Sequence, residues 1–301
     1  GDDEGGAFVA GADDYSAPYW NPAGVTRGNS VYLGGMRYDQ YGLGLNLDYL
    51  SGGLNLSQGS STEASFLPSF EFPIIEGFSF AATYLGFSTD VRTLGPGGSE
   101  IPITYGERAF LATAGLEFPL VGSFGLSGKR YSYSAPDAGV DGKDASATGL
   151  GFDIGYLAEP LEGLSIGLAG FDITGTDINW KNTPTEPTNI APAHYSLGAA
   201  FRADVDHSMI PDQASGDLLA SGQYSFGPNV LNKIRTGLEY SFSIFSLRAG
   251  AVKPDENDIY FSAGAGIKVN FITGDLAWVQ NNSLEGDNTT DTIVFSTEFK
   301  F

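Results

Sequence analysis

The 301-residue sequence contains no cysteine, so it holds neither a disulfide framework nor a thiolate metal site. It also lacks any apolar run that approaches the ~20 residues of a membrane-spanning helix. The absence of such a run excludes a helical membrane protein. It does not exclude a protein that crosses a membrane with strands.

Basic residues are scarce, with 15 Lys and Arg against 36 Asp and Glu, and the formal net charge is −21. Binding to nucleic-acid phosphates needs clustered Lys and Arg, so we expect no nucleic-acid partner. The acidic residues gather in segments that are typical of loops, where charge runs usually serve solvation. These segments are 2–4, 13–14, 137–144, 204–217, 255–258 and 285–291.

Glycine is abundant, with 42 residues, and aromatic residues make up 13% of the chain. Aromatic side chains favour strands, and glycine suits turns and crowded interiors. In the last ten residues, Phe295, Phe299 and Phe301 fall on one face and Glu298 on the other, because alternate side chains of a strand point to opposite sides. We predict that this strand closes a barrel by pairing with a strand that begins near Ser30.

The same alternation recurs in many segments after residue 29. One face is bulky and apolar, and the other consists of Gly, Ser and single charges, as in 78–85, 110–118, 150–156, 195–202 and 261–271. A soluble sandwich carries large polar residues outside, whereas a membrane barrel has an apolar outer band and a polar lumen. The pattern predicts an all-β fold, a transmembrane antiparallel β-barrel of about 14 strands.

The links between these strands are short and long in turn, as in barrels with tight turns at one end and longer loops at the other. A short link is 241–244, and long links are 89–105 and 175–191. The link 204–216 is long where a short one is expected. The region from Ser30 to Leu56 is either one long strand or a broken pair.

Residues 1–29 lack strand alternation and are rich in Gly, Ala and Asp. Disordered segments are poor in aromatic residues, but this segment concentrates them next to an Asn-Pro turn. We therefore predict that residues 1–29 form a plug inside a barrel made by residues 30–301. Its aromatic residues either line an apolar ligand pocket or only anchor the plug to the wall. The residues concerned are Tyr15, Tyr19, Trp20, Asn21, Pro22 and Gly24.

Charged residues of both signs fall on the predicted lumen face of the strands. Because buried charges must be paired, we expect them to pair with one another and to hold the plug. The alternative is that they form a polar path through the barrel. These residues are Glu117, Asp153, Arg202, Glu239, Arg248 and Lys268.

The segments Tyr19 to Gly24 (Y-W-N-P-A-G) and Asn29 to Gly35 (N-S-V-Y-L-G-G) resemble the opening of FadL-type long-chain fatty-acid transporters and their PorV-like relatives. The strand start at Pro192 and the hairpin from Thr236 to Gly250 are similar to further elements of this family. The resemblance implies a fourteen-stranded barrel in a Gram-negative outer membrane, with an N-terminal plug inside it. It also implies that hydrophobic molecules diffuse through the plug region and leave sideways into the membrane.

Two motifs raise the possibility of an enzyme or a metal site. Residues 163–167 fit G-x-S-x-G, and Ser165 with His194 could form a hydrolytic pair that acts on lipid. The motif lies within an alternating strand rather than between a strand and a helix, so we expect no enzyme. The aspartates of 137–144 lack the spacing of a calcium loop, and we expect neither metal nor other cofactor.

The sequence thus favours a barrel in the lipid of the outer membrane that binds or passes small hydrophobic molecules. One alternative is a PorV-like barrel that transports nothing and docks secreted or surface proteins at its acidic external loops. The second alternative is the lipid-acting barrel enzyme.

Overall fold

The structure is a computed structural model that describes residues 8–28, 31–40, 45–57, 75–94, 100–205, 216–255, 258–280 and 291–301. Most of these residues form antiparallel strands of a single sheet. The described helices are α1 (Ala17–Trp20) and two 3-10 helices, η2 (Pro22–Thr26) and η3 (Val140–Gly142). None of the helices in the described part of the chain is long and apolar enough to cross a membrane.

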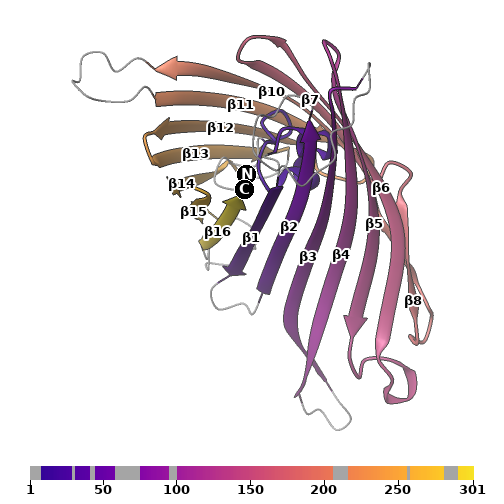
Figure 1. Cartoon of the computed structure of the whole chain (residues 1–301). Coiled ribbons are helices and arrows are strands. Elements are labelled where there is room, and N and C mark those ends of the chain that lie inside the picture. The colour runs from indigo at the N-terminus through magenta and orange to yellow at the C-terminus, as the bar shows by residue number, and fades with distance from the viewer. Residues whose placement is uncertain are drawn as a thin grey trace.

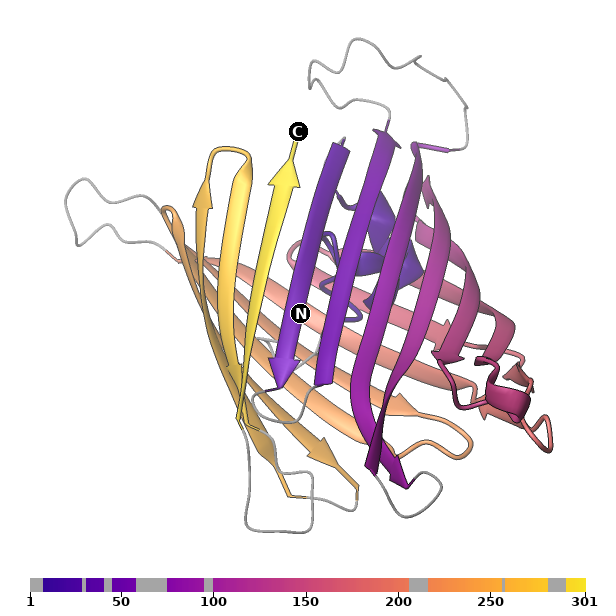
Figure 2. The ribbon, with the colours of Figure 1, turned by 90° about the horizontal axis from the view of Figure 1, so that it is seen from below.

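Fourteen of the described strands form a closed antiparallel barrel (Figure 1, Figure 2). Its first half is β1 (Val31–Gln40), β2 (Leu45–Ser57), β3 (Gly77–Leu94), β4 (Glu100–Phe118), β5 (Gly122–Ala135), β6 (Ala145–Leu161) and β7 (Leu164–Phe171). Its second half is β10 (His194–Val205), β11 (Gly216–Phe226), β12 (Lys233–Phe242), β13 (Phe245–Pro254), β14 (Tyr260–Val269), β15 (Ile272–Val279) and β16 (Thr292–Lys300). β1 and β16 close the barrel, with Tyr32 opposite Lys300. The predicted barrel and its predicted closing pair are confirmed.

The structure settles the strand arrangement of two segments that the sequence analysis left open or predicted differently. The region from Ser30 to Leu56 is a broken pair, because β1 and β2 run antiparallel beside each other. The link 175–191, expected to be a loop, instead contains a hairpin of β8 (Thr176–Lys181) and β9 (Thr188–Ala191). This hairpin extends the edge of β6 beyond the part that pairs with β7. The sequence prediction of a loop there is corrected.

The two ends of the barrel differ in their connections. Four tight turns lie at the end where β16 finishes, which we call the turn end. Each holds a residue with positive φ, as hairpin turns of this kind require: Leu120, Gly163, Ser243 and Asn270. The opposite end, the loop end, carries η3 and the β8–β9 hairpin. Residues 206–215, in the unusually long link, lie outside the described residues.

Side chains alternate between the outer face and the lumen, as β16 illustrates. Ile293 and Phe295 are 49% and 59% exposed, whereas Val294 and Glu298 are each 4% exposed. An apolar surface of this extent is unstable in water and is stabilised by hydrocarbon, so the barrel spans a membrane. Other strands expose Leu33, Leu50, Phe80, Phe110, Leu126, Phe152, Leu168, Leu197, Leu238, Leu247, Phe261 and Leu276 in the same way.

Replacing Phe295 with Lys should impair assembly, because a Lys on the lipid face near the bilayer midplane costs about 2–4 kcal/mol. Ser296→Lys is the matched control, since residue 296 points into the lumen and is paired with Asp275. The measurement is the folded fraction after refolding into lipid vesicles, read from the mobility of unheated samples on gels. Equal folded fractions for the two variants would contradict the assigned faces.

Candidate functional site

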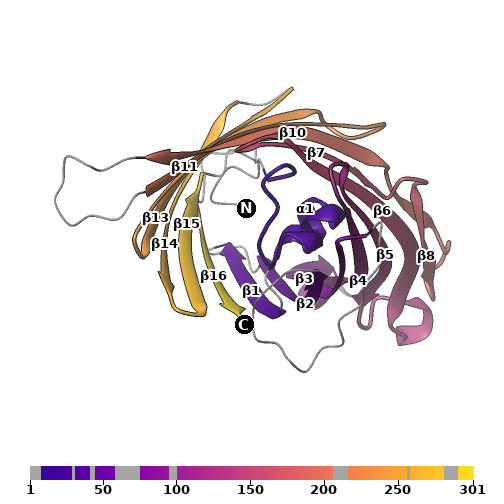
Figure 3. The same cartoon turned by 45° about the horizontal axis from the view of Figure 1, so that its top comes forward.

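The segment 8–28, here called the plug, lies inside the barrel (Figure 3). Its η2 contacts β2 to β6, and Val9, Asn21 and Val25 are almost fully buried. The predicted N-terminal plug is therefore part of the fold. Its boundary at residue 29 stays a prediction, because residues 1–7 and 29–30 lie outside the described residues.

Glycines on the inner face of the wall allow the plug to approach closely. A Cβ atom added at Gly125 of β5 would lie 2.1 Å from the carbonyl carbon of Pro22. One added at Gly155 of β6 would lie 2.1 Å from Asn21 Oδ1. Real Cβ contacts essentially never fall below 3.0 Å, so the wall accepts the plug backbone here only because it lacks side chains. Gly167 likewise faces the backbone of Val9, whereas Gly34, Gly115 and Gly198 leave room for plug side chains, those of Tyr15, Val25 and Val9.

Asn21 joins the plug to this glycine-lined wall through its Nδ2 and caps a plug helix through its Oδ1. Its Nδ2 donates to the carbonyl oxygen of Val9 at 2.8 Å and to that of Tyr156 on β6 at 3.1 Å. Its Oδ1 accepts from the amide of Ala23 at 3.0 Å and so caps η2, which begins with Pro22. The sequence Asn-Pro thus sets a turn, a helix start and an attachment to the wall at one place.

The plug makes fewer bonds to the second half of the barrel. The amide of Val9 donates to Gln223 Oε1 of β11 at 3.1 Å. The amide of Tyr15 donates to Glu298 Oε1 of β16 at 3.0 Å. The plug also packs on the start of the second half, where Ala10 lies in a buried cluster with Ala200 of β10 and Leu219 of β11, and a gap remains beside β12 to β16.

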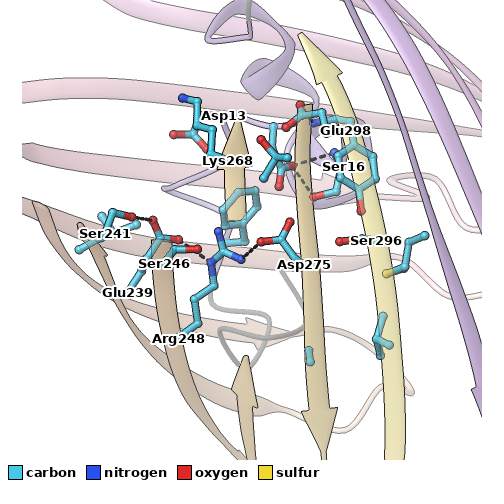
Figure 4. Close-up of a pocket in the computed structure, with 18 of the residues that line it drawn as sticks. Asp13, Ser16, Glu239, Ser241, Ser246, Arg248, Lys268, Asp275, Ser296 and Glu298 are labelled. Carbon is cyan, nitrogen blue, oxygen red and sulfur yellow. Dashed lines mark hydrogen bonds and ion pairs between the residues drawn. The ribbon is translucent and has the colours of Figure 1, made fainter. Parts of the chain in front are cut away.

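This gap is a cavity of about 400 Å³ between the plug and the second half of the barrel (Figure 4). The plug contributes aromatic rings to it, with the Tyr19 ring edge-on to Trp20 at a centroid distance of 5.0 Å. The Tyr15 ring lies 5.8 Å from that of Tyr49 on β2. Toward the loop end, the barrel adds further apolar side chains, from Met36, Leu47 and Leu85. An apolar molecule would find aromatic contacts on this side.

The wall of the cavity on β12 to β16 is polar. Arg248 of β13 lies between two carboxylates (Figure 4). Its Nε donates to Glu239 Oε2 of β12 at 2.7 Å, and its Nη1 contacts Asp275 of β15. On β16, Lys300 Nζ lies 3.0 Å from Glu298 Oε2. Arg248 is therefore held by carboxylates of other strands, and Lys300 is held by a carboxylate of its own strand.

A further ion pair joins the plug to β10, with Arg202 Nη2 located 3.3 Å from Asp13 Oδ2. Removal of Asp13 from bulk water raises the pKa of its carboxyl, and the negative Asp14 adds to this rise, whereas Arg202 opposes it. Both side chains remain partly exposed to the lumen. This pair therefore contributes modestly to holding the plug.

No protein-family model matches the sequence, and no curated protein matches it. Among solved structures, a FadL homologue of Pseudomonas aeruginosa is similar over 98% of this chain and 95% of its own, with 13% identity and a TM-score of 0.56. The toluene transporter TodX of Pseudomonas putida is similar over 98% and 97%, with 10% identity and a TM-score of 0.55. The monoaromatic hydrocarbon channel CymD is similar over 97% and 94%, with 12% identity and a TM-score of 0.55.

The chain has the FadL-type barrel fold. This fold, closed and apolar on its outside, makes the chain a multi-pass protein of the Gram-negative outer membrane. The FadL-type fold also agrees with the resemblance that the Asn-Pro element suggested.

The structure does not bring Ser165 and His194 together. Ser165 is paired with Ala200 of β10, whereas His194 is paired with Phe171 of β7. Six positions along β10 correspond to about 20 Å, far beyond hydrogen-bonding reach. The Ser165 hydroxyl instead accepts from Arg27 of the plug at 3.2 Å, and the His194 ring stacks on Phe171 at 4.7 Å. The similar structures are transporters and channels rather than enzymes.

The other predicted site residues fall into separate places in the FadL-type barrel. The cavity is lined by Tyr15, Tyr19, Trp20, Arg202, Glu239, Arg248 and Lys268. The contact between plug and wall holds Asn21 and Pro22, whereas Gly24 packs inside the plug against Ala12 and Ala17. Glu117 and Asp153 do not line the cavity, and Phe295, Phe299 and Phe301 belong to the outer face of the closing edge.

Asp153 belongs to a buried network near the loop end. Lys129 Nζ of β5 lies 2.8 Å from Asp153 Oδ1 and 2.8 Å from Asp172 Oδ2. The hydroxyls of Tyr131 and Thr176 donate to Asp172 at 2.9 and 2.7 Å. This network connects β5 and β6 to the start of the β8–β9 hairpin and is separate from the cavity.

Several cavity residues were missed by the sequence analysis, among them Met36, Tyr49 and Asp275. Alternation does place all three on inner faces, but it does not tell which inner residues lie at the same height. Glu298 was predicted only to lie on the face of the last strand opposite to Phe295 and Phe299, without a role there. The position of the plug determines where the cavity lies, and it makes Glu298 and Lys300 part of the cavity lining.

Gly125→Ala should displace the plug, because the new methyl group would overlap the Pro22 backbone. Leak of small solutes through the barrel, reconstituted in vesicles, should increase, while the folded fraction stays close to that of the parent. Gly128→Ala is the matched control on the same strand, since its Cβ atom would meet no atom within 4 Å. Unchanged leak in Gly125→Ala would contradict the assigned contact.

Proposed function

We propose that this barrel binds small hydrophobic molecules in the cavity beside Trp20 and passes them across the outer membrane. The observation that carries the proposal is the cavity itself, which is held open between the plug and the second half of the barrel. Its size of about 400 Å³ lies in the range of small-molecule sites. Its aromatic side suits an apolar guest.

The lining of the cavity changes along the barrel axis. Apolar side chains such as Met36 and Leu47 stand toward the loop end, whereas Lys268 and Ser243 stand at or next to the turns of the turn end. The turn end also offers apolar lining residues, Ile244 and Phe245, so a hydrophobic molecule finds apolar contacts at both ends of the cavity. The turn end is the periplasmic end of such barrels, and we expect release of the molecule there.

Similar structures give the proposal a second support. They include a toluene transporter and a monoaromatic hydrocarbon channel. Identity to them is 10% and 12%, so they indicate the class of cargo only through the shared fold. Docking of a surface protein at the acidic external loops stays a prediction, and one of those acidic segments, 285–291, falls largely on residues 281–290, outside the described part.

Met36→Trp should reduce uptake of toluene into vesicles that contain the barrel by about tenfold, because the larger ring fills the loop end of the cavity. Leu33→Trp is the matched control on the same strand, since residue 33 faces lipid and is 48% exposed. Uptake is measured as the rate of arrival of radiolabelled toluene in the lumen of the vesicles. Equal uptake by both variants would argue against passage through this cavity.

Folding of the two variants is compared in the same preparations, through the gel mobility of unheated samples. A correctly folded Met36→Trp barrel with parental uptake would overturn the proposed route. Parental uptake by vesicles without any barrel would show that toluene crosses lipid unaided, so the assay reports only the excess over that rate.

A further inference from the structure

The cavity carries an excess of negative groups. Its acidic lining residues are Asp13, Asp14, Asp217, Glu239, Asp275 and Glu298, and its basic ones are Arg202, Arg248, Lys268 and Lys300. An aromatic pocket for apolar molecules does not need these charges. Their imbalance therefore bears on which polar head group a guest can carry.

Most of the positive charge in the cavity is already neutralised. Arg248 contacts two carboxylates, those of Glu239 and Asp275. Lys300 is paired with Glu298, and Arg202 is paired with Asp13 of the plug. Within the described part of the chain, only Lys268 lines the cavity without an ion pair to a carboxylate. It stands at the turn end, away from the aromatic rings.

At the turn end, the carboxylates of the described residues outnumber Lys268, the cation there that has no ion pair. Asp217 of β11 lines the cavity and is directly paired with Asp204 of β10. Alternation from Arg202 places Asp204 on the lumen face as well. Two carboxylates directly opposite each other on neighbouring strands repel, so this pair weakens the local sheet. The pair makes the end of the passage negative.

From this distribution we infer that the cavity discriminates by charge, accepting uncharged and amine-bearing hydrophobic molecules and rejecting carboxylates. The inference rests on the proposed function, because it specifies the substrate class of the same cavity. It concerns the head group of the guest, whereas the proposed function concerns its apolar part.

The chemistry of the wall supports this selection. An ammonium has three donors, and the carboxylates of the cavity are hydrogen-bond acceptors. A hydroxyl can likewise donate to them. A carboxylate brings only acceptors, and it meets net negative charge in a space partly shielded from water, where like charges repel more than in bulk solvent. The polar wall of the cavity thus disfavours hydrophobic molecules that carry a carboxylate.

Three ligands with the same chain and different head groups test the inference: octylamine, octanol and octanoate. At pH 7 the first is a cation, the second is neutral and the third is an anion. Binding is followed by the fluorescence of Trp20 in phosphatidylcholine vesicles, with Trp180→Phe and Trp278→Phe removing the other two tryptophans. We expect octylamine and octanol to perturb Trp20 at concentrations about tenfold lower than octanoate does.

Asp217→Lys is the decisive variant, because the side chain has no hydrogen bond or ion pair to lose among the described residues and its replacement changes the charge by two units. The ratio of octylamine to octanoate affinity should fall by about tenfold in this variant. Asp177→Lys, on the exposed face of β8, makes the same charge change outside the cavity and should leave the ratio unchanged. Comparing ratios between variants cancels the different partitioning of the three ligands into lipid.

The outcomes separate this inference from the proposed function. Equal binding of octylamine and octanoate by the parent barrel, or the same ratio in Asp217→Lys and the parent, would overturn charge selection while leaving hydrophobic binding in place. Failure of all three ligands to perturb Trp20 would overturn the proposed function, and charge selection with it. A ratio that shifts equally in Asp217→Lys and Asp177→Lys would mean that net surface charge, not the cavity wall, is responsible, and it would also overturn the inference.

Discussion

The close contact between the plug backbone and the glycines of the barrel wall is the constraint on which the site depends. Gly125 and Gly155 leave space where any side chain would overlap Pro22 or Asn21. Asn21 then uses that space to bond the wall and its own helix at once. Because an amide buried with all its bonds satisfied is costly to displace, the plug is fixed in height and rotation within the lumen.

The cavity is a consequence of how unevenly the plug is held. On the first half of the barrel, backbone packs against backbone with almost no space between. On the second half, side chains such as Gln223 and Glu298 reach across to single plug amides. A barrel of fourteen strands is too wide to be filled by a plug of about twenty residues, so a plug that packs on the first half and on the start of the second must leave a gap beside β12 to β16. The function we propose uses that gap.

The sequence was sufficient for features that follow a local period and insufficient for features that depend on position around the barrel. Alternation separates Phe295 from Glu298 without any knowledge of the fold, because a strand has only two faces. It cannot tell that Asp153 joins a buried network with Lys129 while Glu239 faces the cavity, since both are inner residues of strands. That distinction depends on strand tilt and on which wall the plug meets. The β8–β9 hairpin was missed for a related reason: its strands are short and one of them pairs only with the other.

One arrangement, a cation between two carboxylates, occurs twice among the described residues of the lumen, with different consequences. Around Lys129 it is almost fully buried, and the Lys129, Asp153 and Asp172 side chains are 9%, 1% and 4% exposed. A charge so far from water must be paired, and the hydrogen bonds that Asp172 accepts from Tyr131 and Thr176 complete a rigid support near the loop end. Around Arg248 the same trio faces the cavity and keeps contact with solvent. Each group of three holds one more negative charge than positive. Only the group around Arg248 faces the cavity and can present that excess to a passing molecule. The location of the plug thus decides which of the two groups acts on a guest.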